Sequence, residues 1–123
     1  MAAIREPIAD AEMEVLKVLW SGGPLSAREL TEAVYGEANA STIGTVQKLL
    51  QRLEAKGCVK RDRSQYVHRF TAKVTQAQVA GRQLELLAKK VADGSLMPFI
   101  THLVQAGRLS EQEKAEIRKL LEE

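Results

Sequence analysis

The sequence predicts a mainly α-helical protein with one small antiparallel β hairpin. Apolar residues recur at helical spacing in six separate stretches, and glycines or helix-capping residues mark the ends of these stretches. Between the third and fourth stretches, residues 58–70 instead combine β-branched and aromatic side chains with basic ones, which is typical of strands. The chain has 123 residues, 45% of them hydrophobic and 28% charged. This is enough for one ordinary domain or two very small ones.

Two short helices open the predicted fold. We expect the first to begin at Asp10, whose carboxylate can accept hydrogen bonds from exposed backbone N–H groups, and to end at the glycines of residues 22–23. The second is expected to begin at Ser26, which forms an S-x-x-E capping box with Glu29, and to end at Gly36. The apolar stripe of the first helix consists of Met13, Leu16, Leu19 and Trp20.

The third predicted helix has two contrasting faces. We expect it to follow Ser41 and to end before Gly57, which takes the position after the C-cap. Its core face consists of Val46, Leu49, Leu50 and Leu53, at positions i, i+3, i+4 and i+7. The opposite face is polar, small and almost free of acidic residues, and it consists of Ser41, Gly44, Thr45, Lys48, Gln51, Arg52 and Ala55.

The hairpin is expected to pair residues 58–62 with residues 66–70 through the link Arg63-Ser64-Gln65. The turn type stays open, because no Asn-Gly or Asp-Gly dipeptide fixes it. Alternation along the second strand would place Tyr66, His68 and Phe70 on one side and Val67 and Arg69 on the other, although a slip of one residue would invert this.

Three helices are predicted in the C-terminal part. Thr75 and Gln78 form a capping box for a fourth helix that ends at residues 93–94, Ser95 is expected to cap a fifth helix, and Ser110 a sixth. A segment of about fifty residues has too little interior to bury the apolar faces of three helices, so we expect two copies to pair. The predicted dimer interface is Leu84, Leu87, Val91, Leu96, Phe99, Ile100, Leu103, Ile117 and Leu120.

Charge is distributed unevenly along the chain. Residues 1–40 carry a net charge of −4, residues 41–73 carry +6, and residues 74–123 carry 0, in agreement with the total of +2. The cationic stretch covers the third helix and the hairpin. Binding of such a surface to DNA phosphates releases condensed counterions, so this distribution indicates a nucleic-acid partner.

Three short helices followed directly by a basic hairpin are the order of a winged helix-turn-helix. In that fold the third helix enters the DNA major groove and the hairpin, called the wing, lies along the backbone. We therefore expect a DNA-binding domain over residues 1–74 and a dimerisation domain over residues 75–123. Thr45 and Lys48 are expected to reach base edges, whereas Arg52 and the wing arginines are placed for phosphates. The predicted DNA contacts are Ser41, Thr42, Gly44, Thr45, Gln47, Lys48, Arg52, Arg61, Arg63, Tyr66 and Arg69.

Successive blocks of the chain resemble the BlaI/MecI group of winged-helix repressors. These blocks are IADAEMEVLKVLW, GPLSARELTEAV, TVQKLLQRLEAKG, RSQYVHRF and SLMPFITHLVQAGRLSEQEKAEIRKLLEE, and together they cover nearly the full length. The resemblance implies a homodimeric, sequence-specific repressor of antibiotic-resistance or stress genes that binds an inverted-repeat operator. In some branches of the group it also implies a regulatory protease as partner.

The chain departs from the group in places that bear on function. Members cut by a protease carry Asn-Phe in the fifth helix, where this sequence has His102 and Leu103, so the resemblance does not carry a cleavage site over to this chain. Gly44 stands where relatives often have a longer polar residue, and this difference would change or relax base preference at one position. The operator sequence of the relatives therefore does not carry over to this chain.

Other function classes fit the sequence less well. His68 and His102 lie in different predicted elements without a Cys or carboxylate at metal or triad spacing, and Cys58 is the only cysteine, so we expect no enzyme, metal or cofactor. The start, Met1 to Pro7, contains Arg5 and Glu6 where a signal peptide would be apolar, and a cytoplasmic location without membrane contact is expected. Two alternatives remain: a winged-helix module for protein contacts, and a ligand-sensing regulator.

Overall fold

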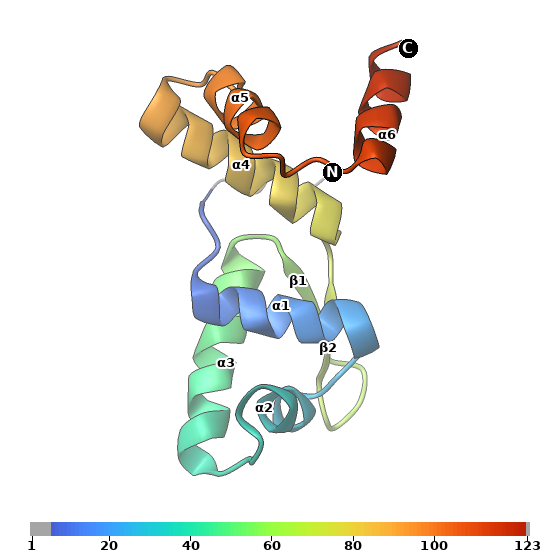
Figure 1. Cartoon of the computed structure of the whole chain (residues 1–123). Coiled ribbons are helices and arrows are strands. Elements are labelled where there is room, and N and C mark those ends of the chain that lie inside the picture. The colour runs from blue at the N-terminus through green and yellow to red at the C-terminus, as the bar shows by residue number, and fades with distance from the viewer. Residues whose placement is uncertain (1–5, 123) are drawn as a thin grey trace. The chain divides into compact units, whose positions relative to one another are not determined.

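The structure is a computed structural model that describes residues 6–122, so residues 1–5, Arg5 included, and residue 123 lie outside the described part. Its elements follow the order α1 (Asp10–Gly22), α2 (Ala27–Tyr35), α3 (Ala40–Ala55), β1 (Val59–Asp62), β2 (Arg69–Ala72), α4 (Gln76–Ala92), α5 (Met97–Gln105) and α6 (Glu111–Leu121) (Figure 1). The predicted fold class, mainly helical with a small antiparallel sheet, is confirmed.

The chain divides into two compact units, Met1–Leu84 and Glu85–Glu123. The division falls inside α4, whereas the sequence suggested a functional boundary between residues 74 and 75. The first turns of α4 belong to the first unit: Val79 is buried in its core, and the backbone N–H of Ile8 donates to Oε1 of Gln83.

The core of the first unit lies between α1, α2, α3 and the hairpin. All four residues expected on the inner face of α3 are buried there, which confirms the predicted orientation of this helix. Each fully buried leucine contributes roughly 1.5–3 kcal/mol relative to an exposed one. The opposite face of α3 is therefore fixed toward solvent. The core side chains of the helices are Val15, Leu16, Leu19, Leu30, Val46, Leu49, Leu50 and Leu53.

Reciprocal capping boxes begin three helices where the sequence predicts them. In α2, the backbone N–H of Glu29 donates to Oγ of Ser26, and the backbone N–H of Ser26 donates back to the Glu29 carboxylate. The same exchange joins Thr75 to Gln78 before α4, and Ser110 to Glu113 before α6. Because a capping box depends on residues only three apart, it can be read from sequence without knowledge of the packing.

The helix α1 begins at Asp10 as predicted, but its predicted cap is wrong, and the predicted starts of α3 and α5 are wrong by two residues and one residue. Asp10 is the first residue of α1 and not its cap; the preceding residue is Ala9, whose N–H donates to the Glu12 carboxylate. Ser41 lies inside α3, because Asn39 caps this helix. Ser95 does not cap α5, which begins two residues later after Leu96 without a side-chain cap.

The wing differs from its prediction in register. Its strands are β1 and β2, so the second strand begins at Arg69 and not at residue 66. Phe70 exchanges two backbone hydrogen bonds with Leu25, of 2.8 and 3.1 Å, and this bridge fixes the second strand independently of the turn. Tyr66 lies in the link between the strands and is fully exposed, so the expectation that it shares a face with buried Phe70 is wrong.

The second unit has almost no interior of its own. Ala88 is the one residue classed as buried among the described residues 85–122. Large apolar side chains of α4, α5, α6 and the residue that precedes α5 are exposed instead: Leu87, Val91, Leu96, Met97, Ile100, Leu103, Val104, Ile117, Leu120 and Leu121. In the part of the chain that the structure describes, no helix combines the length and apolar character needed to cross a membrane.

Candidate nucleic-acid interface

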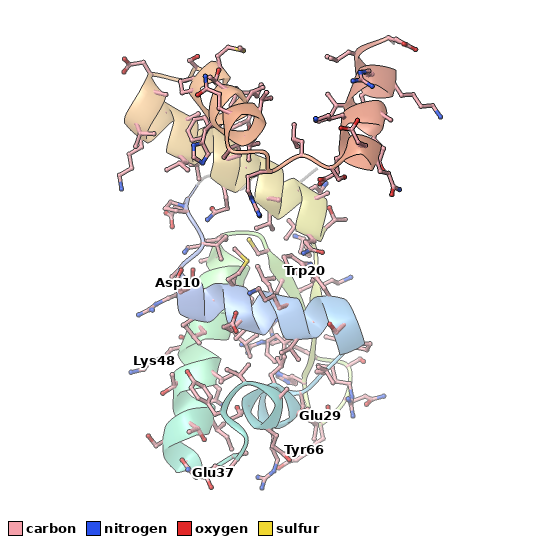
Figure 2. All side chains as sticks on the ribbon, viewed as in Figure 1. Asp10, Trp20, Glu29, Glu37, Lys48 and Tyr66 are labelled. Atoms are coloured by element: carbon pink, nitrogen blue, oxygen red, sulfur yellow. The ribbon has the colours of Figure 1, made fainter. Side chains whose placement is uncertain are left out.

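The outer face of α3 is exposed to solvent and carries polar and cationic side chains. Thr45, Lys48 and Arg52 are all exposed. Neither Lys48 nor Arg52 forms an ion pair within the described residues, and Figure 2 shows Lys48 pointing away from the helix into solvent. The hydroxyl of Thr45 donates to the carbonyl of Ser41, one turn earlier, at 3.1 Å. These cationic and hydroxyl groups can make hydrogen bonds to base edges or phosphates.

The first turn of α3 is closed by its cap. The backbone N–H of Thr42 donates to Oδ1 of Asn39, and the N–H of Asn39 donates to the hydroxyl of Thr42. Thr42, predicted as a DNA contact, therefore uses part of its hydrogen-bonding capacity inside the helix end, whereas Ser41 is exposed. Gly44 has open space around the position that a Cβ would take.

The arginines of the wing differ in how strongly they are paired. Arg63 is 63% exposed, and its guanidinium lies 3.8 Å from the carboxylate of Glu54. Arg69 forms a shorter ion pair, 2.9 Å, with Glu29 at the start of α2. Arg61 is only 22% exposed, pairs with Glu54 at 3.0 Å and stacks on the Phe70 ring. The surroundings of Arg61 fit a structural role better than the phosphate contact expected from sequence.

Two carboxylates beside these arginines have lowered pKa values. The backbone N–H of Ser26 lowers the pKa of Glu29 most, and the charge of Arg69 lowers it further. Hydrogen bonds from the side chain and backbone of Ser64 lower the pKa of Asp62 at the end of β1. Both groups therefore stay ionised at neutral pH, and the wing carries fixed negative charge beside its cations.

A groove of about 410 Å³ lies between α3, the wing and the start of α2. Gln47 and Gln51 line it from α3, and the wing contributes Val67, His68, Arg61 and Phe70. Of the polar residues among these, Gln51 and His68 were absent from the predicted contacts, although Gln51 was recognised on the polar face of α3. The position of His68 depends on the register of the wing, which no local signal in the sequence fixes.

The structure brings the predicted DNA contacts of α3 and the wing together in the first unit. The predicted dimer contacts all lie on α4, α5, the residue that precedes α5, or α6, and all but half-buried Phe99 are exposed. No group of three or more potential metal ligands occurs among residues 6–122.

Comparison with known sequences places these features in a family. A sequence model described as Penicillinase repressor matches residues 8–123. The chain belongs to the penicillinase repressor family. The BlaI/MecI resemblance is thereby confirmed, and the family is one of transcriptional repressors.

Individual members of the penicillinase repressor family align along nearly their whole length. The penicillinase repressor of Bacillus licheniformis is 24% identical over 116 residues, which cover 94% of this chain and 90% of the relative. The methicillin resistance regulatory protein MecI of Mammaliicoccus sciuri is 25% identical over 114 residues, 93% and 92% of the two chains. The penicillinase repressor of Staphylococcus aureus is 24% identical over 123 residues, 98% and 95%.

Proposed function

We propose that this protein is a sequence-specific DNA-binding repressor that acts as a homodimer on an inverted-repeat operator in the cytoplasm. The observation that carries the proposal is the outer face of α3, where Lys48 and Arg52 have no ion-pair partner among residues 6–122 and extend from a helix whose other face is buried. The names of the aligned relatives favour control of antibiotic-resistance genes, and stress genes are the other class considered.

Base reading and backbone contact are assigned to different side chains. Thr45 and Lys48 lie in the part of α3 that enters the major groove first, where Lys48 can donate to guanine and Thr45 can contact a thymine methyl group. Arg52 lies about two turns beyond Thr45 and one turn beyond Lys48, and it meets the DNA backbone. The remaining proposed contacts are Ser41, Thr42, Gly44, Gln47, Arg63, Tyr66 and Arg69.

Arg63 is the strongest candidate for a phosphate contact on the wing, because it is well exposed and its ion pair with Glu54 is long. Replacement of Arg63 by Ala should weaken binding to all DNA sequences alike. It should also reduce the slope of log affinity against log salt concentration by about 1 per contact, hence about 2 per dimer. An unchanged slope would remove Arg63 from the interface.

Pairing through residues 75–123 is supported by the exposed apolar faces of α4, α5 and α6. Burial of each large side chain on association contributes roughly 1.5–3 kcal/mol, from which the cost of ordering is subtracted. A symmetric dimer would repeat the same contacts twice and would present two copies of α3 to an inverted repeat. Sedimentation should give a dimer at micromolar concentration, and a helical monomer under those conditions would refute the pairing.

Selection of bound DNA from a random library tests the whole proposal. We expect an inverted repeat with half-sites one or two helical turns apart. Lys48→Ala should then cost about 1–3 kcal/mol at one base pair per half-site and leave nonspecific binding nearly intact. Arg52→Ala should weaken matched and mismatched sites alike. The reverse pattern would mean that a different part of α3 reads the bases.

A further inference from the structure

Arg61 connects the wing to the recognition helix α3. It lies opposite Phe70 in the register of the two strands, on the face of the hairpin that packs toward the core. Its guanidinium carbon is 4.9 Å from the centre of the Phe70 ring, and its terminal nitrogen is 3.0 Å from Oε1 of Glu54 in the last turn of α3. One side chain therefore bridges β2 and α3.

This bridge is held on both sides. Phe70 is buried and bonded through its backbone to Leu25, so the ring beneath the guanidinium has a fixed position. Glu54 is only 26% exposed, and it belongs to a helix whose inner face is fully packed. A planar guanidinium that both stacks on a ring and pairs with a carboxylate has little freedom to turn toward another partner.

The neighbouring Arg63 shows the contrast. It shares the Glu54 carboxylate but lies 3.8 Å from it and is largely exposed. Arg63 can exchange this loose contact for a phosphate with little loss, whereas Arg61 would have to leave both Phe70 and a 3.0 Å ion pair. The two arginines are therefore suited to different tasks.

The groove beside Arg61 has the chemistry of a site for a sugar-phosphate strand. The side-chain amides of Gln47 and Gln51 and the imidazole of His68 can donate hydrogen bonds to phosphate oxygens. Val67 and Phe70 offer apolar surface for a deoxyribose, and no carboxylate is among the lining residues. A helix in the major groove and a wing on the backbone leave one DNA strand to pass between them.

We propose that Glu54 and Arg61 are positioning residues that hold the wing at a fixed distance from α3, so that the groove between them admits one sugar-phosphate strand of the operator. This inference rests on the proposed DNA-binding function. Arg61 sets the width of the groove and makes no phosphate contact itself. Glu54 strengthens operator binding despite its negative charge, because without it the wing loses the ion pairs that join its arginines to α3.

The test compares Arg61→Met and Glu54→Ala, singly and together, with wild-type protein and with Glu14→Ala. Glu14 is an exposed carboxylate on α1 that pairs with Lys17, so its removal changes the net charge by the same amount as Glu54→Ala without touching the wing. Each of the two wing variants should weaken operator binding about tenfold, and the double variant should bind no more weakly than either single one, as expected for one interaction. The salt slope should stay at the wild-type value in all of them.

A phosphate contact by Arg61 predicts different results. Loss of Glu54 would then free Arg61 and strengthen binding, and loss of Arg61 would reduce the salt slope by about 1 per copy. If Glu54→Ala and Glu14→Ala strengthen binding equally, Glu54 acts only through its charge. Either result overturns the inference while leaving the proposed function intact.

A second readout needs no DNA. Amide relaxation of residues 63–68 in the free protein should show greater mobility than wild type in both wing variants and wild-type mobility in Glu14→Ala. Trp20 fluorescence verifies that each variant is folded. A wing as ordered as that of the wild type would overturn the inference. If wild-type protein fails to bind any DNA in a salt-dependent manner, the proposed function itself is wrong.

Discussion

Replacement of Lys56 by Met should destabilise the first unit strongly, because it leaves a buried carboxylate without its cation. Nζ of Lys56 lies 2.5 Å from Oε1 of Glu12 and also donates to the carbonyl of Pro7. The side chain of Glu12 is 1% exposed and that of Lys56 is 14% exposed. Breaking such a buried pair from one side costs about 3–5 kcal/mol.

The two partners are not equivalent. Glu12→Gln keeps an acceptor for the backbone N–H of Ala9 and leaves an ammonium that can still bond to Pro7, so its cost should be only about 1–3 kcal/mol. The double variant buries no net charge and should be more stable than Lys56→Met alone. Glu12→Gln should thus destabilise the wild-type protein but stabilise the Lys56→Met variant. This change of sign distinguishes the penalty of an unpaired buried charge from simple loss of packing.

Urea unfolding followed by the fluorescence of Trp20, the single tryptophan, measures these differences in the first unit. At one fixed protein concentration, a loss of about 3 kcal/mol with a slope of about 1.5 kcal/mol per molar urea lowers the midpoint by about 2 M. Lys17→Met, which removes an exposed lysine, is the control and should leave the midpoint unchanged. A Lys56→Met midpoint within 0.5 M (roughly 0.7 kcal/mol) of wild type would refute the reasoning.

Three further outcomes can be measured directly. Gly44→Ala should raise the stability of α3 by up to about 1 kcal/mol, since a Cβ there meets open space. The same change should weaken operator binding if α3 approaches the bases closely. Unchanged operator affinity would place Gly44 away from the DNA. Because the pKa of Glu29 is lowered in the folded state, the stabilisation by its carboxylate is complete above its ordinary pKa of 4.5 and is lost as the pH falls through the folded-state value. Glu29→Gln should therefore flatten the acid side of the plot of unfolding free energy against pH. Parallel plots for variant and wild type would contradict this. Burial raises the pKa of the Cys58 thiol, so an aromatic disulfide reagent at pH 8 should modify it only as fast as the first unit opens. Modification at the rate of a free thiol would be inconsistent with the fold.

What the sequence could predict depended on the range of the interactions involved. The caps at Ser26 and Ser110 follow from partners three residues away, and the core face of α3 follows from helical periodicity. The cap of α1 was misassigned because Ala9 has no capping side chain. The Glu12 carboxylate accepts from the exposed N–H of Ala9 instead, and Asp10 offered a misleading local alternative. Local rules thus located the elements well and their first residues less well.

The candidate site was predictable on the helix and less so on the wing. The polar face of α3 is defined by the same periodicity as its core face. The second strand was placed three residues early because its register is set by Leu25, forty-five residues before Phe70, and not by the turn. The inward orientation of Arg61 depends on that register and on Glu54, so sequence reasoning grouped it with the exposed arginines.

The exposed apolar helices of the second unit have a consequence for gene dosage. On the proposed pairing, these helices find an interior only in a second molecule, so at low abundance the concentration of paired chains rises with the square of the free-chain concentration. Unpaired chains would present exposed apolar helices to cellular proteases. A modest fall in synthesis then lowers operator occupancy and molecular lifetime together, and the controlled genes would switch on over a narrow range of repressor copy number.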